Sequence, residues 1–170
     1  MRPFSKIFAV AAERKGGADA LERLLHSPLT SAALGAIPGD RWLSEMTRCV
    51  FQAGFDWSLI DKKWKDFEKA FEGFDVNRWF LMSDDDVNQL AEAPNIVANI
   101  AKIRSVGANA VFLTNVSKSH GSAGAYFASW TPERYMELLQ ILKAEGSRLG
   151  GKTGQFFLRQ IGRASCRERV

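Results

Sequence analysis

The sequence predicts an all-α fold, and three observations support this fold class. Apolar residues recur every three or four positions in nearly every segment, which is the period of an amphipathic helix. Several segments start at a residue that caps helices and stop at a glycine. No run of alternating apolar and polar residues indicates a β-strand. At 170 residues, 46% of them hydrophobic, the chain is long enough to bury a core within one domain.

Four helices are expected in the first half of the chain. The first three run over residues 5–14, 18–26 and 40–53, and "SPLTSAALGAIPG" at 27–39 has the composition of a linker. The fourth covers residues 57–71, where charged residues such as Asp61 fill the face opposite an apolar stripe. The stripe consists of Trp57, Ile60, Trp64, Phe67 and Phe71.

Three more helices are expected before residue 130. Ser83 caps a helix over 83–93, and the three aspartates that follow it complement the positive end of the helix dipole. The other two helices run over 95–113 and 122–129.

The last two helices flank a glycine-rich turn. Thr131 caps the first of them, Pro132 takes its first helical position and Gly146 ends it. The second covers "KTGQFFLRQ" at residues 152–160.

The turn contains "GSRLGGKT" at residues 146–153, which matches the phosphate-loop pattern G-x-x-x-x-G-K-[ST]. A phosphate loop follows a β-strand, whereas a helix precedes this turn, so the sequence argues against a nucleotide hydrolase. The order helix, turn, helix instead predicts a helix-hairpin-helix, whose backbone N–H groups hold a DNA phosphate at a helix N-terminus. The residues expected to bind DNA here are Arg148, Gly150, Gly151, Lys152 and Thr153. An ordinary turn with a solvated lysine is the alternative.

Composition excludes several classes of protein. The formal charge of +4 permits a polyanionic partner without requiring one. The two cysteines and two histidines lack the spacing of a zinc site, so we expect no metal, no cofactor and no structural disulfide. The apolar run at residues 7–12 is too short for a signal peptide or a membrane span, so we expect a cytoplasmic protein without membrane contact.

The last ten residues, "IGRASCRERV", lack helical periodicity and differ in character from the segment before them. Their back-translation matches a sequencing-adapter sequence. We therefore expect a single domain over residues 1–160 that is truncated at its C-terminus, followed by a non-native tail at 161–170. A natural basic tail is the alternative.

Five short motifs follow one another in a fixed order. They are "QAGFDW" at 52–57, "GFD" at 73–75, "DVNQL" at 86–90, "IVANIAKI" at 96–103 and "GGKTGQFF" at 150–157. In this order they resemble the DNA-3-methyladenine glycosylase I family, and the resemblance covers residues 42–160.

The resemblance implies a two-lobed helical DNA repair enzyme that acts as a monomer on double-stranded DNA with alkylated bases. Such an enzyme extrudes the damaged base into a pocket and hydrolyses its bond to the sugar. N3-methylated adenine is cationic, which weakens that bond, and an aromatic pocket favours a cation. A helix-hairpin-helix protein that binds DNA but has lost catalysis is the alternative.

The resemblance and helical spacing together suggest the site residues. Trp42, Glu45, Cys49 and Gln52 are spaced three or four apart and share one helix face, and Trp57 matches the pocket aromatic of the family. We expect Glu45 and Gln52 to be catalytic, and Trp42, Cys49 and Trp57 to line the base pocket. Cys49 stands where the family commonly has a glutamate, and we expect Glu45 to supply the charge. A solvated surface acid is the alternative for Glu45, and a core position is the alternative for Trp57.

Two residues of the fourth motif complete the expected site. Asn99 and Lys102 match the pattern of the family and are expected to approach the DNA backbone. A solvated surface position is the alternative for Lys102.

Overall fold

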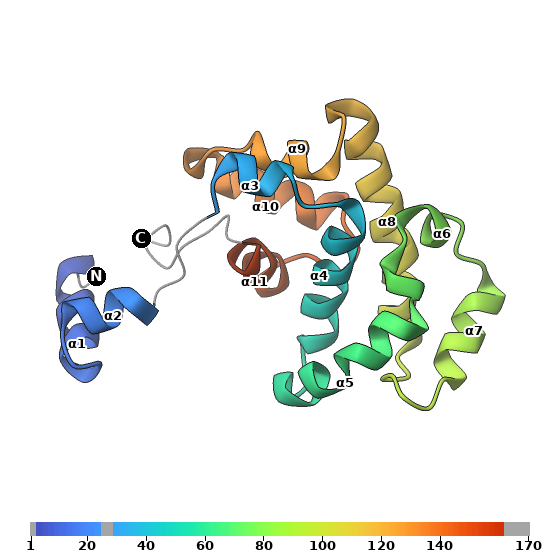
Figure 1. Ribbon diagram of the computed structural model, residues 1–170, viewed down its shortest axis with the longest axis horizontal. Coiled ribbons are helices and arrows are strands. Elements are labelled where there is room, and N and C mark those ends of the chain that lie inside the picture. Colours follow the sequence, from blue (N-terminus) through green and yellow to red (C-terminus); the bar gives the residue numbers. More distant parts are fainter. Residues whose placement is uncertain (1–2, 25–28, 162–170) are drawn as a thin grey trace.

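A computed structural model describes residues 3–24 and 29–161, and it confirms the predicted all-α class. All regular elements within these residues are α-helices or short 3-10 helices. The first two helices, α1 (Phe4–Arg14) and α2 (Ala18–Leu24), pack against each other, and Figure 1 shows this pair to one side of the other helices.

Two helices form the centre of the remaining structure. They are α4 (Gly39–Gln52) and α8 (Ile100–His120), which pack against each other and contact helices on both of their sides (Figure 1). One side consists of α5 (Trp57–Ala70), η1 (Glu72–Phe74), α6 (Val76–Phe80) and α7 (Asp84–Glu92). The other side consists of α3 (Ser31–Gly35), α9 (Ala123–Ala128), η2 (Pro132–Arg134), α10 (Tyr135–Ala144) and α11 (Lys152–Gln160). This arrangement agrees with the expected two lobes.

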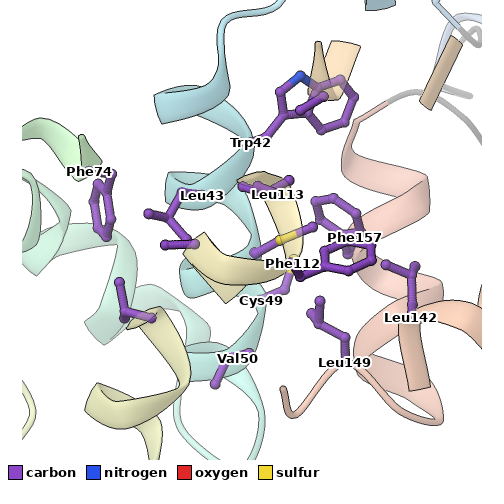
Figure 2. Packing of buried hydrophobic residues seen from close by; sticks show 14 of the residues in the cluster. Trp42, Leu43, Cys49, Val50, Phe74, Phe112, Leu113, Leu142, Leu149 and Phe157 are labelled. Atoms are coloured by element: carbon purple, nitrogen blue, oxygen red, sulfur yellow. The ribbon is translucent and has the colours of Figure 1, made fainter. Parts of the chain in front are cut away.

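The hydrophobic core follows the apolar faces of α4 and α8. Figure 2 shows side chains from α4, α8 and α11, including Leu43, Leu113 and Phe157, in one buried cluster. All three side chains are fully buried. Burial of apolar surface is the main favourable contribution to folding, so this cluster fixes the position of α11 relative to α4.

A second part of the core is an aromatic stack at the C-terminal end of α5. The rings of Trp64 and Phe67 lie 5.3 Å apart and nearly parallel, and the rings of Phe71 and Phe74 lie 5.2 Å apart. The indole N–H of Trp79 donates to the Phe71 carbonyl at 2.6 Å, so its polar atom is satisfied inside the stack. The stack holds α5, η1 and α6 together.

Residues 72–74 make a turn that needs an unusual backbone. Glu72, Gly73 and Phe74 have φ values of 49°, 68° and 62°, which lie in the left-handed region. Glycine adopts this region without steric cost, which explains the "GFD" motif at this point. Asp75 then caps α6, which the sequence analysis did not predict, by accepting hydrogen bonds from the N–H groups of Asn77 and Arg78.

The predicted helix boundaries differ from the structure in three further places. The expected linker at 27–39 contains α3, which Thr30 caps, while residues 27 and 28 lie outside the described part. The long central helix starts at Ile100, because Asn99 is its N-cap, and it ends at His120 instead of residue 113. Pro132 starts a 3-10 turn before α10.

The predicted tail begins with Ile161, which is buried and whose N–H donates to the Phe157 carbonyl at 3.0 Å. Residues 162–170 lie outside the described residues. Over the ranges 3–24 and 29–161, no helix is both long enough and apolar enough to cross a bilayer.

Candidate functional site

A pocket of about 270 Å³ lies where α4, α5 and α11 meet. It opens beside the loop that joins α4 to α5 and beside the first turn of α11. The residues that line it are Cys49, Gln52, Ala53, Gly54, Phe55, Trp57, Lys152, Thr153 and Phe156. Three predicted pocket or catalytic residues and two residues of the predicted hairpin therefore meet at one cavity, although about a hundred residues separate them in the sequence.

Two aromatic side chains form a wall of the pocket. Trp57 opens α5, and its ring contacts that of Phe156 edge-on, with centroids 4.9 Å apart. Trp57 remains 42% exposed, whereas the later residues of the same stripe are in the core. A large aromatic side chain that stays exposed beside a cavity offers a flat apolar surface to a planar ligand.

Gln52 is the polar side chain that α4 contributes to the pocket. Its amide Nε2 donates to Asp61 Oδ1 at 3.0 Å, and the same oxygen accepts from Arg48 Nη2 at 2.8 Å. Its Oε1 lies 3.5 Å from Nε2 of Gln160 on α11. Gln52 is thus held from both sides, and only 3% of it is exposed.

Cys49 lines the pocket in its protonated form. Burial raises the pKa of the Cys49 thiol, and the nearby Glu45 carboxyl raises it further, so the thiolate is disfavoured. The Cys49 Sγ lies 3.7 Å from Glu45 Oε1, where the thiol donates to the carboxyl. Cys49 therefore stays a protonated thiol and contributes a small, largely apolar surface to the pocket.

Glu45 does not line the pocket itself, but it contacts Cys49, which does. Burial raises the pKa of the Glu45 carboxyl; the charge of Arg48 and the Cys49 hydrogen bond oppose this rise, and Asp61 adds to it. Glu45 is not a lining residue of the pocket, so it makes no direct contact with a molecule bound there. Its predicted catalytic role stays a prediction.

Trp42 lies in the core and not in the pocket. It is 1% exposed, its ring stacks on Phe127 with centroids 4.4 Å apart, and its indole N–H donates to the Ile37 carbonyl. The helix face that it shares with Gln52 extends over three turns of α4. Only the last of these turns reaches the pocket, which is why the shared face did not predict the position of Trp42.

The glycine-rich turn joins α10 to α11, so a helix and not a strand enters it. Asn109 of α8 holds the turn through both polar atoms of its side chain, because Oδ1 accepts from the Ser147 N–H at 2.7 Å and Nδ2 donates to the Ser147 carbonyl at 3.1 Å. Leu149 is fully buried and fixes the turn to the core. Gly151 has a φ of 57° just before α11 begins.

The hairpin residues predicted to bind DNA lie at the surface or near it. Arg148 is exposed, and its Nε donates to the Ala101 carbonyl at 3.1 Å. Lys152 is exposed and Thr153 is half-buried, and both also line the pocket. Gly150 packs near Lys143 of α10. The first turn of α11 thus presents backbone N–H groups and a positive charge next to the cavity.

Lys102 is buried, in contrast to the predicted DNA contact. Its ammonium donates to the carbonyls of Phe51 and Ala53, at 3.2 and 2.5 Å, and lies 4.3 Å from the centre of the Phe55 ring. Burial lowers the pKa of Lys102, and the charge of Arg148 lowers it further. Lys102 satisfies the C-terminal carbonyls of α4 and holds the pocket loop, a position that spacing alone did not reveal.

The side chain of Asn99 is also hydrogen-bonded within the protein. Its side chain accepts from the Lys102 N–H at 3.1 Å and caps α8. Asn99 and Lys102 thus lie close to Arg148 of the hairpin, which bonds to the Ala101 carbonyl, but their own polar atoms are used inside the protein.

Several residues of the site were not predicted. Phe156 was only part of a motif, and Asp61 was assigned to the charged face of its helix. Asn109 carried no visible signal, because an asparagine within a helix is unremarkable until its partner on a distant turn is known.

A model of the methyladenine glycosylase family matches residues 40–145. No curated protein matches the chain. A structure of 3-methyladenine DNA glycosylase I from Staphylococcus aureus is similar, with a TM-score of 0.67 and 22% identity over 81% of this chain and 80% of that chain. A tyrosine-to-phenylalanine variant of 3-methyladenine DNA glycosylase I in complex with 3-methyladenine is similar to the same degree, with a TM-score of 0.67, 22% identity and 81% of each chain covered.

Proposed function

Because this chain belongs to the methyladenine glycosylase family, which confirms the predicted enzyme class, we propose that its pocket takes up 3-methyladenine extruded from double-stranded DNA. The observation that carries the proposal is the position of the Trp57 and Phe156 wall beside the first turn of α11. One cavity thus combines a surface on which a base can stack with a helix N-terminus that suits a phosphate. Its volume of about 270 Å³ lies just below the range of about 300–1,000 Å³ that is usual for ligand pockets, and it suits one base better than a whole nucleoside triphosphate.

The reaction breaks the bond between N9 of the base and C1′ of the sugar. The bonding electron pair goes to the base, which neutralises its positive charge, and water adds to C1′ and loses a proton to solvent. Because the cationic base is already a good leaving group, the site needs to bind and orient it more than to protonate it. Trp57 and Phe156 attract the cation through their ring faces, and Gln52 fixes an edge of the base.

The hairpin holds the DNA beside the extruded nucleotide. We expect the backbone N–H groups of Gly151 and Lys152, the Lys152 ammonium and the Thr153 hydroxyl to bind one phosphate, with Arg148 contributing a further positive charge. One chain supplies both the pocket and the hairpin, so we propose that the protein acts as a monomer. We also propose that it acts in the cytoplasm. Light scattering during gel filtration tests the oligomeric state.

Release of the free base tests the enzymatic function. DNA treated with dimethyl sulfate is incubated with the protein, and free 3-methyladenine is measured by mass spectrometry. We expect release that rises with enzyme concentration, and its absence at micromolar enzyme would contradict the proposal.

A catalytically impaired DNA-binding protein is the second candidate, and one observation favours it. Among the described residues that line the pocket, none carries a carboxylate. A mobility shift of alkylated DNA without release of any base would support this candidate over the first.

A further inference from the structure

One carboxylate oxygen of α5 holds two side chains of α4. Asp61 Oδ1 accepts from Gln52 Nε2 at 3.0 Å and from Arg48 Nε and Nη2 at 3.0 and 2.8 Å. Gln52 lines the pocket, whereas Asp61 and Arg48 do not. The network therefore reaches the pocket through a single amide.

The chemistry of this contact fixes the orientation of the amide. An ionised carboxylate only accepts hydrogen bonds, so the NH₂ group of Gln52 must face Asp61. Both hydrogens of this NH₂ group then lie at the end of the amide that faces Asp61, and the carbonyl oxygen is the polar atom of Gln52 at the other end. Its contact with Gln160 Nε2, at 3.5 Å, lies at the outer limit of a hydrogen bond, and a carbonyl oxygen has room for a second donor.

We propose that Asp61 is a positioning residue that orients the carbonyl oxygen of Gln52 as the acceptor for the pocket and thereby selects methylated adenine over methylated guanine. This inference rests on the proposed function. Adenine carries an amino donor on C6, whereas guanine carries a carbonyl acceptor at the same position. An acceptor that meets an acceptor leaves both unpaired in a buried site, so the guanine lesion is rejected.

Another carboxylate of α5 provides a matched comparison. Glu68 also ties α4 to α5, because it accepts from Arg41 Nη1 at 2.9 Å and from Ser44 Oγ at 2.6 Å. Its partners lie outside the pocket lining. If Asp61 only held the two helices together, a change from carboxyl to amide at Asp61 or at Glu68 would have the same kind of effect on base preference.

The test compares the wild-type chain with Asp61→Asn and Glu68→Gln. Each protein is incubated with dimethyl sulfate-treated DNA, and released 3-methyladenine and 3-methylguanine are measured by mass spectrometry to give kcat/KM for each base. Asparagine donates as well as accepts, so Gln52 is free to turn in Asp61→Asn. We expect the preference for adenine over guanine to fall about tenfold or more in this variant and to stay unchanged in Glu68→Gln. An unchanged preference in Asp61→Asn overturns the inference.

Binding of the free bases gives a second readout that does not depend on DNA cleavage. Quenching of tryptophan fluorescence measures the affinities of wild type, Asp61→Asn and Gln52→Leu for 3-methyladenine and 3-methylguanine. Both variants are expected to lose the preference for the adenine base, and equal preferences in all three proteins contradict the positioning role. If wild type releases no base from DNA, the proposed function fails. If it does release base but Asp61→Asn keeps the wild-type ratio, only the role of Asp61 fails.

Discussion

The two ends of α5 belong to one apolar stripe but meet different surroundings. At the C-terminal end, Phe67 and Phe71 are fully buried in the aromatic stack. At the N-terminal end, Trp57 is 42% exposed and faces the pocket with Phe156. Helical periodicity thus places all of these residues on one face, but elements distant in sequence decide whether that face becomes core or binding site.

This difference separates stability from activity along a single helix. A buried ring contributes to the free energy of folding in proportion to the surface that it removes from water. An exposed ring contributes little to folding, and its surface remains available to a ligand. Variants at the two ends are therefore expected to affect different measurements.

The largest effect on stability is expected for Phe67→Ala at the core end. Loss of a buried phenylalanine ring and the resulting cavity cost about 3–5 kcal/mol of unfolding free energy. Urea unfolding followed by circular dichroism measures this loss. Molecules that remain folded should excise base at a rate near that of wild type, and an unchanged unfolding midpoint would contradict the prediction.

The opposite pattern is expected for Trp57→Ala at the pocket end. Stacking of a base on an aromatic side chain contributes about 1–3 kcal/mol, so kcat/KM for base release should fall by about 5–150-fold. Unfolding free energy should change by less than about 1 kcal/mol, because the side chain is exposed. Leu59→Ala is the matched control, since Leu59 is 43% exposed on the same helix but does not line the pocket. Equal losses of activity in the two variants would argue against stacking on Trp57.

Lys102→Met is expected to lower both the unfolding free energy and the rate of base release, because Lys102 connects the core to the loop between α4 and α5. The change leaves the carbonyls of Phe51 and Ala53 without their donor, at a cost of about 1–3 kcal/mol. Base release should also slow, since the loop that carries Phe55 loses its attachment. Arg104→Met on the exposed face of α8 serves as control, and equal behaviour of the two variants would show that Lys102 has no special role.

The smallest effect is expected for Glu45→Gln, as a change in the pH dependence of stability. Burial raises the pKa of Glu45 above its ordinary value of 4.5, so the folded protein binds this proton more tightly than the unfolded chain does. The protonated Glu45 carboxyl therefore stabilises the folded state. This contribution to the free energy of unfolding is fully present below about pH 4.5 and is lost as the pH rises through the raised pKa. Urea unfolding across this range should show the decline in wild type but not in Glu45→Gln. The predicted catalytic role requires the same variant to release base more slowly, and an unchanged rate would remove Glu45 from the catalytic residues.

The sequence was sufficient to predict the fold class and most helices, because periodicity and caps are local properties. Ser83 forms the predicted cap of α7, and the stripe of α5 from Ile60 to Phe71 faces the core. The short helices α3 and α6 were missed, because five residues are too few to show a period.

The site was less predictable, because its contacts join distant segments. Gln52 and Trp57 follow from a local motif, and the structure brings them together with Lys152 and Thr153. The role of Asp61 depends on the rotation of α5 against α4, which a single sequence does not reveal. Lys102 matched the same family pattern but is buried against α4.

The enclosed ammonium of Lys102 has a practical consequence for chemical labelling. Amine-reactive reagents acylate uncharged amines that solvent reaches, and Lys102 is 6% exposed with its protons bound to two carbonyls. It therefore becomes modified only in molecules whose α4–α5 loop has lifted away. Its acylation rate, compared with that of the exposed Lys62, reports how often the loop opens.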